Sequence, residues 1–126
     1  MPKDPIKGQG WAVASLTDLG DGPGFRKVRS ALDVTAFGVN AVVMPAGYAT
    51  GRHFHQRQQE LYLVLEGEIE FEFGDGEKQT LGRGGVARVD PATVRRMRNT
   101  SADAEAMYFA VGGDGGYVGR DGQTLD

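Results

Sequence analysis

The chain has 126 residues, 40% of them hydrophobic, a size and composition that fit one compact domain. Its net charge of -3 and isoelectric point near 5.3 leave no basic surface of the kind that binds nucleic acid or an anionic membrane, so neither is expected as a partner. The sequence contains no cysteine, which excludes disulfides and thiolate chemistry, and no apolar segment is long enough to cross a bilayer.

The first third of the chain is expected to contain short extended segments. A strand is predicted over 11–16 and an extended run over 25–32, separated by a loop at 20–24 in which glycine and proline exclude regular structure. A strand is predicted over 37–44 because the segment is rich in β-branched and apolar residues, and Pro45 is expected to end it.

Strand signals continue through the middle of the chain. Residues 61–66 are mostly apolar, and in 68–73 glutamates alternate with isoleucine and phenylalanine, the period of an antiparallel strand with one buried and one solvated face. Further strands are predicted over 78–81, 86–89, 94–99 and 106–111. Many short strands without a confident helix indicate an all-β sandwich or barrel, and a jelly roll suits this number of strands.

These elements divide one domain into three parts. We expect N-terminal strands over 1–36, a barrel core over 37–112, and a tail over 113–126 that is rich in glycine and aspartate. Such a composition buries little apolar surface, so the tail is expected to pack weakly or fray. The first residues lack the apolar stretch of a secretory signal, and together with the absence of cysteine this predicts a cytoplasmic protein.

The only two histidines stand at His53 and His55, separated by Phe54. In an extended strand, side chains two positions apart point to the same face, so both imidazoles are expected on one face and Phe54 on the other. If the chain turns between Gln56 and Gln59, the carboxylate of Glu60 returns to the same place. Two histidines and one carboxylate suit a divalent transition metal such as Fe, Mn, Ni or Zn.

The spacing around these histidines resembles the first signature motif of the cupin superfamily. The segment Gly47-x5-His53-x-His55-x4-Glu60-x6-Gly67 is similar to that motif at every defined position. The resemblance implies a cupin-type double-stranded β-helix, a jelly-roll barrel that commonly forms a homodimer and holds a metal ion in its mouth. It implies no particular reaction, because the fold hosts oxygenases, decarboxylases, isomerases and sugar-binding proteins.

The second cupin motif is only partly present. Gly85-x5-Pro91 and Asn99 resemble it, but Arg95 stands where the family normally supplies a third metal-binding histidine. In the predicted strand, Arg95 shares a face with Met97, whose apolar side chain is expected to point inward. The opposite register would bury two other arginines together, which is costly.

An inward arginine leaves two hypotheses open, because a guanidinium remains a cation and cannot bind a metal. In the first, a metal is held by the two histidines and Glu60, and Arg95 binds the carboxylate or phosphate of a small organic ligand, as in a metal-dependent oxygenase or isomerase. In the second, Arg95 forms an ion pair with Glu60, and the protein is a metal-free, non-catalytic ligand-binding or sensory barrel. Neither hypothesis assigns a catalytic residue.

Residues 61–66 bear on both the cavity and the oligomeric state. Tyr62 lies on the same face of the strand as Glu60 and is a second candidate for ligand binding. Leu61, Leu63 and Leu65 make the opposite face apolar as well, so both faces need to be covered. A second subunit would cover the outer face, and we expect a homodimer.

Overall fold

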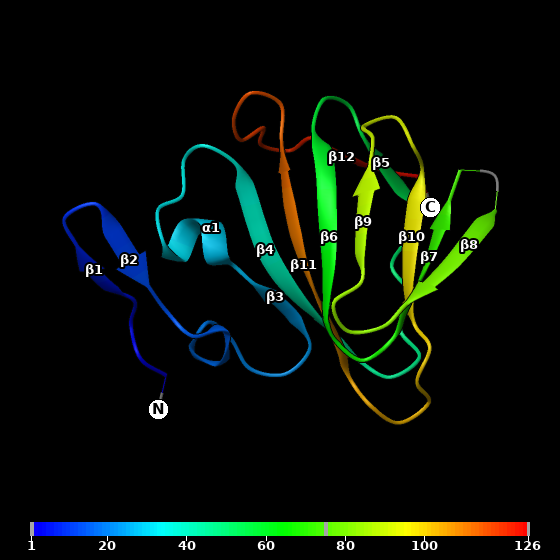
Figure 1. Cartoon of the computed structure of the whole chain (residues 1–126), viewed down its shortest axis with the longest axis horizontal. Helices are drawn as coiled ribbons and strands as arrows, with labels where there is room; N and C mark the ends of the chain where they lie inside the picture. The colour runs from blue at the N-terminus through cyan, green and yellow to red at the C-terminus, as the bar shows by residue number, and fades with distance from the viewer. Residues whose placement is uncertain (1, 75, 126) are drawn as a thin grey trace.

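The computed structural model describes residues 2–74 and 76–125. Two five-stranded antiparallel sheets form its body, and a separate two-stranded hairpin lies at the N-terminal end (Figure 1). The strands are β1 (Ile6–Gly8), β2 (Trp11–Val13), β3 (Gly24–Arg26), β4 (Gly38–Met44), β5 (His53–His55), β6 (Gln59–Glu66), β7 (Ile69–Phe73), β8 (Glu77–Leu81), β9 (Val86–Val89), β10 (Arg95–Asn99), β11 (Ala106–Gly113) and β12 (Gly122–Thr124). The described residues also form two short helical segments, a 3-10 turn at Leu16–Asp18 and α1 at Val28–Ala31. Neither is long enough to span a membrane.

The order of the strands is that of a jelly roll. One sheet runs β3-β4-β11-β6-β9 and the other runs β12-β5-β10-β7-β8, with every neighbouring pair antiparallel. Strands that follow each other along the chain often lie in different sheets, so the two sheets are wound together. This arrangement confirms the predicted all-β double-stranded β-helix.

The core lies between the two sheets and is built by alternation along their strands. In β7, Ile69 and Phe71 are fully buried, while Glu70 and Glu72 lie on the other face. Tyr62 and Val64 of β6 meet them from the opposite sheet, in one continuous apolar cluster. The two-residue period predicted from the sequence therefore places the core correctly.

Gly67 makes the turn from β6 to β7 in a conformation that other residues rarely adopt. Its φ is +76°, and a Cβ placed on it would lie 2.9 Å from the Cβ of Ala106. We expect Gly67→Ala to lower the free energy of unfolding by about 1–2 kcal/mol, the usual cost of a left-handed L-residue. Urea denaturation checks this, with Gly82→Ala as control because open space surrounds Gly82. Equal urea midpoints for the two variants would contradict the expectation.

Two predicted elements in the first third of the chain are wrong. The strand expected over 11–16 ends at Val13. The extended run expected over 25–32 ends at Arg26, the last residue of β3 that pairs with β4, and the chain then forms the single α-helical turn α1. Without a strand partner, backbone groups beyond Arg26 are satisfied by i to i−4 hydrogen bonds, and Val28 is buried.

The expectation that the tail packs weakly or frays is also wrong. Strand β12 pairs with β5, with Gly122 opposite His55 and Thr124 opposite His53. The amide of Leu125 donates to the carbonyl of Arg52 and extends the pairing. Strand pairing uses backbone groups, which a segment poor in apolar side chains still provides. The tail thus forms one edge of the sheet that carries both histidines.

Candidate metal centre

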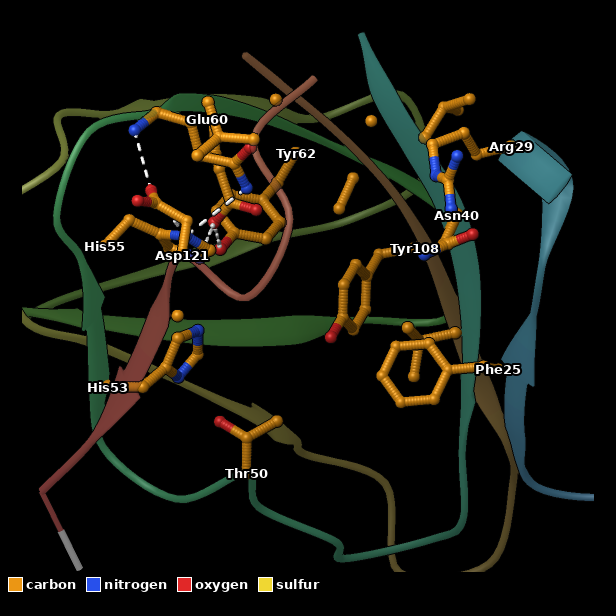
Figure 2. A pocket seen from close by; sticks show the side chains of 18 of the residues that line it. Phe25, Arg29, Asn40, Thr50, His53, His55, Glu60, Tyr62, Tyr108 and Asp121 are labelled. Atoms are coloured by element: carbon orange, nitrogen blue, oxygen red, sulfur yellow. Dashed lines mark hydrogen bonds and ion pairs between the residues drawn. The ribbon is translucent and has the colours of Figure 1, made fainter. Parts of the chain in front are cut away.

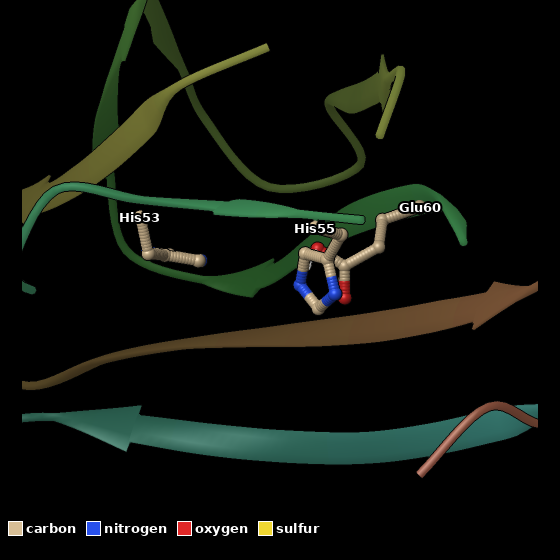
Figure 3. Close-up of side chains that lie close together, drawn as sticks. All are labelled: His53, His55 and Glu60. Atoms are coloured by element: carbon tan, nitrogen blue, oxygen red, sulfur yellow. Dashed lines mark ion pairs between the residues drawn. The ribbon is translucent and has the colours of Figure 1, made fainter. Parts of the chain in front are cut away.

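Strand β5 and the turn after it bring the three predicted ligands together. His53 and His55 point to the same cavity, and Phe54 is absent from its lining, as the strand period predicts. The chain turns at 56–58, and β6 then carries Glu60 back beside them. One ligand atom from each of these three residues lies within 4.8 Å of the others (Figure 3). This group could hold a metal ion.

The spacing of two of these atoms already fits a shared metal ion. Nε2 of His55 lies 3.1 Å from Oε1 of Glu60. Two ligands bound at about 2.1 Å and about 90° apart on one ion lie about 3 Å from each other. The pair therefore needs little movement to share an ion.

Each histidine has its Nδ1 facing a hydrogen-bond acceptor. Nδ1 of His53 lies 3.2 Å from the carbonyl oxygen of Gly51, and Nδ1 of His55 lies 3.4 Å from Oδ2 of Asp121. An imidazole that donates from Nδ1 presents an unprotonated Nε2 to a metal, and a carbonyl and a carboxylate are the usual partners of metal-binding histidines. The surroundings of both rings therefore suit metal binding.

Asp121 is the residue of this centre that sequence reasoning missed. Its side chain is 2% exposed and accepts hydrogen bonds from the backbone amides of Arg57 and Gln58, besides its contact with His55. Burial raises the pKa of Asp121, but the Gln58 and Arg57 amides and His55 outweigh it and hold the pKa below its usual range. Asp121 thus stays ionised and fixes both the turn and the His55 ring.

Gln58 is the second polar group behind His55. Its side chain is buried, and Nε2 lies 3.3 Å from Nδ1 of His55, while Oε1 has no hydrogen-bond partner among the described residues. Turning the amide by 180° would exchange these atoms and place the Oε1 acceptor at Nδ1. Gln58 therefore has the chemistry to support the same Nδ1 proton as Asp121.

The Glu60 carboxylate is held by neighbours on three sides. Besides the contact with His55, its Oε1 accepts a hydrogen bond from the hydroxyl of Tyr62 and lies 3.9 Å from Nη2 of Arg95. Burial raises the pKa of Glu60, but the hydrogen bonds from His55 and Tyr62 and the charge of Arg95 outweigh it, so the pKa lies below its ordinary value. Burial and, to a smaller extent, the negative charge of Glu60 raise the pKa of Tyr62. Its hydroxyl therefore stays protonated and can donate a hydrogen bond.

Arg95 points inward with Met97, in the register that the sequence predicts. It is fully buried, and its guanidinium donates to the backbone carbonyls of Val89, Asp90 and Pro91 at 3.2–3.5 Å. The residues that line the cavity do not include it. The structure thus places Arg95 behind the Glu60 carboxylate and not on the cavity wall, where a bound ligand would meet it.

A cavity of about 580 Å³ opens beside the three candidate ligands. Figure 2 shows His53, His55 and Glu60 at one end of it, Phe25, Arg29 and Asn40 at the other, and Tyr108 reaching in between. Tyr62 is part of the wall near Glu60. Pockets of about 300–1,000 Å³ are typical of sites for small organic molecules.

A double-stranded β-helix with two histidines and a glutamate converging in its mouth has the features of the cupin class. Residues 40–112, more than half of the chain, match the family described as "Cupin domain", and the chain belongs to this family. None of the curated proteins compared with the chain matched it.

Similar solved structures agree on the fold. A cupin protein from Bacteroides fragilis is 23% identical with a TM-score of 0.70, and the match covers 83% of this chain and 85% of that chain. An uncharacterized conserved protein with a double-stranded beta-helix domain from Klebsiella pneumoniae is 21% identical with a TM-score of 0.63, covering 72% and 76%. A sugar phosphate isomerase from a cupin superfamily of Silicibacter pomeroyi is 25% identical with a TM-score of 0.63, covering 74% and 66%.

Proposed function

We propose that this cupin binds one divalent transition metal ion through His53, His55 and Glu60 and takes a small organic ligand into the adjoining cavity. The observation that carries the proposal is the convergence of one ligand atom from each residue within 4.8 Å. The acceptors that face both Nδ1 atoms support it, because a ring that donates from Nδ1 can bind a metal through Nε2; at His55 the ion would take the place of the Nε2 proton donated to Glu60.

The donor set indicates which ions and which chemistry fit. Two imidazoles and one carboxylate suit Fe, Mn, Ni or Zn with open coordination positions. A bound ion would supply Lewis-acid polarisation of a ligand oxygen or take part in oxygen-dependent chemistry, which are the requirements of an isomerase or an oxygenase. Asp121 holds His55 in orientation and Tyr62 holds the Glu60 carboxylate. The sugar phosphate isomerase among the similar structures favours isomerase chemistry.

Titration of metal-free protein with Mn, Ni and Zn salts tests the proposal. The protein is stripped with a chelator, dialysed and studied by isothermal calorimetry. We expect saturable binding of one ion per chain for at least one of these metals. Heats of dilution alone with all three metals, in protein whose circular dichroism shows an intact β fold, would overturn the proposal.

Metal binding is expected to weaken as the pH falls, because a protonated imidazole cannot coordinate. Burial lowers the pKa of His53 from its ordinary 6.5, so this ring stays neutral at a more acidic pH than an exposed histidine. The pKa of Glu60 is also lowered, so its carboxylate stays ionised over the same range. Calorimetric titrations between about pH 8 and about pH 5 are expected to show nearly constant affinity down to about pH 6.5, the ordinary pKa of histidine, and loss of affinity only at more acidic pH. A constant affinity throughout would contradict this.

A metal-free ligand-binding barrel is the second candidate function. The crowding of Glu60 favours it, since Oε1 accepts from Tyr62 and lies near both His55 and Arg95. The contact between Arg95 and Glu60 that this candidate requires is weak in the structure. At 3.9 Å it is longer than a hydrogen bond, and Arg95 is the smallest of the influences on the pKa of Glu60. The metal titration separates the two candidates.

We also propose that the protein acts as a homodimer in the cytoplasm. The outer face of the first sheet supports the dimer, because Leu61 and Val86 are 47% and 60% exposed and Leu63 lies opposite Val86 in the β6–β9 pair. A second copy would cover this apolar face. Light scattering during size-exclusion chromatography is expected to give twice the mass of the chain. A Leu61→Glu variant is expected to give the monomer mass, and a monomeric wild type would contradict the proposal.

A further inference from the structure

The cavity has a second charged end that the metal centre does not use. We propose that Arg29 and Asn40 form a subsite for an oxyanion, so that the ligand is a small organic molecule with a carboxylate or phosphate at one end and an oxygen donor at the other. The part of this proposal that concerns the oxygen donor of the ligand depends on the proposed metal function. The part that concerns its oxyanion depends only on the residues of the cavity wall.

Arg29 is held in place without a carboxylate partner. It lies in α1, is half-buried, and has its guanidinium carbon 4.0 Å from the centre of the Tyr117 ring. Such a cation–π contact orients the group but leaves its N–H donors free at the edges. No carboxylate of the residues that the structure describes lies at ion-pair distance from Arg29, whereas Arg57 pairs with Asp114 and Arg98 with Glu70.

The acidic charges of the cavity are confined to one end. Among the described residues of its wall, the two acidic ones are Glu60 and Asp121, and both belong to the metal centre. Around Arg29 the cavity adjoins a second hollow of about 410 Å³, which carries Lys27 as a further cation and has no acidic side chain among the described residues that line it. An anionic group is therefore attracted to the Arg29 end, and a metal ion to the other.

The residues around Arg29 also have the hydrogen-bonding chemistry of an oxyanion site. Asn40 supplies an amide donor on β4 and lines both hollows together with Arg29. Phe25 and Tyr117 line both hollows and provide apolar walls for the carbon skeleton of a ligand. Arginine binds carboxylate and phosphate through two parallel hydrogen bonds, so both remain in the ligand class.

Arg120 is the second arginine of the cavity wall and serves as the matched control. It is exposed, directly precedes Asp121 in the chain and is absent from the hollow around Lys27. Replacing it with glutamine removes the same charge from the same cavity. Comparing Arg29→Gln with Arg120→Gln therefore distinguishes a specific contact from the general field of a positive charge.

The test compares pairs of probes that differ only at the distal group. For the carboxylate these are 2-hydroxyglutarate and 2-hydroxyvalerate, and for the phosphate these are 3-phosphoglycerate and glycerate. Affinities for Mn-loaded and metal-free protein are measured by calorimetry, with thermal melting to check that each variant is folded. We expect the member with the distal carboxylate or phosphate to bind more tightly in at least one pair, and Arg29→Gln to weaken its binding about 10- to 100-fold. Arg120→Gln should leave this affinity nearly unchanged, and Arg29→Gln should change little the affinity for the probe without a distal anionic group. Arg29→Lys should restore part of the lost affinity.

The outcomes separate the two proposals. A protein that binds Mn but does not distinguish the members of either pair, or that binds none of the four probes, overturns the oxyanion subsite and leaves the metal proposal standing. A protein that binds no metal but distinguishes a pair through Arg29 overturns the metal proposal and leaves the subsite. Equal losses from Arg29→Gln and Arg120→Gln overturn the assignment to Arg29. The pair that responds shows whether the oxyanion is a carboxylate or a phosphate.

Discussion

Replacing His53 and His55 together with alanine is expected to weaken divalent metal binding by at least about 1,000-fold. Binding energies of about 10–16 kcal/mol for four-ligand zinc sites imply several kcal/mol for each pair of ligands. Glu60 alone would remain, and one carboxylate does not retain a transition metal against water. Calorimetry with the metals that bind the wild type measures the loss.

This double variant is expected to keep its fold. The pairing of β5 with β10 and β12 uses backbone groups, which alanine retains. The control is Gln56→Ala, in the exposed turn between the same histidines and Glu60, which should bind metal like the wild type. Retained affinity in the double variant would place the metal elsewhere and refute the assignment of the ligands.

Asp121→Asn is expected to lower metal affinity by about 10- to 100-fold, the usual effect of removing a carboxylate behind a metal-binding histidine. The buried Asp121 carboxylate lies 3.4 Å from Nδ1 of His55. Asparagine keeps an oxygen that accepts from the backbone of the turn but loses the charge that favours a proton on Nδ1. The ring of His55 is then less firmly oriented and less basic at Nε2.

A purely structural role for Asp121 would give a different result. The absorption spectrum of Co-substituted protein reports ligand geometry, so its bands should shift in Asp121→Asn. The control, Asp114→Asn, removes an exposed carboxylate from the same tail and should change neither the spectrum nor the affinity. If Asp121→Asn lowers the melting temperature but leaves spectrum and affinity as in the wild type, Asp121 only holds the turn.

Much of the fold and the central histidine pair could be predicted because their signals are local. Alternation along 68–73 identifies the buried face of β7, and the spacing of His53 and His55 puts both rings on one face. The alternation of faces along a strand also places Arg95 inward beside Met97. Each of these needs only the conformation of a single strand, which short periodic segments specify well.

The residues that sequence reasoning missed depend on contacts between distant segments. Asp121 meets His55 because β12 pairs with β5, and the backbone pairing of a tail rich in glycine and aspartate leaves no apolar pattern to detect. Arg29 reaches the cavity because the chain forms a helical turn where an extended run is predicted. The alternation of faces along a strand shows that Arg95 points inward but not what it contacts. In the structure its guanidinium donates to backbone carbonyls behind Glu60.

The most direct test of the central claim is anomalous diffraction from crystals of protein purified without chelator and without nickel resin. Data collected on both sides of the Fe, Mn, Ni and Zn absorption edges show whether an ion is present and which one it is. The proposal predicts an anomalous peak at bonding distance from Nε2 of both His53 and His55 and from the carboxylate of Glu60. A site without any such peak, in which Arg95 has closed on the Glu60 carboxylate, would contradict it.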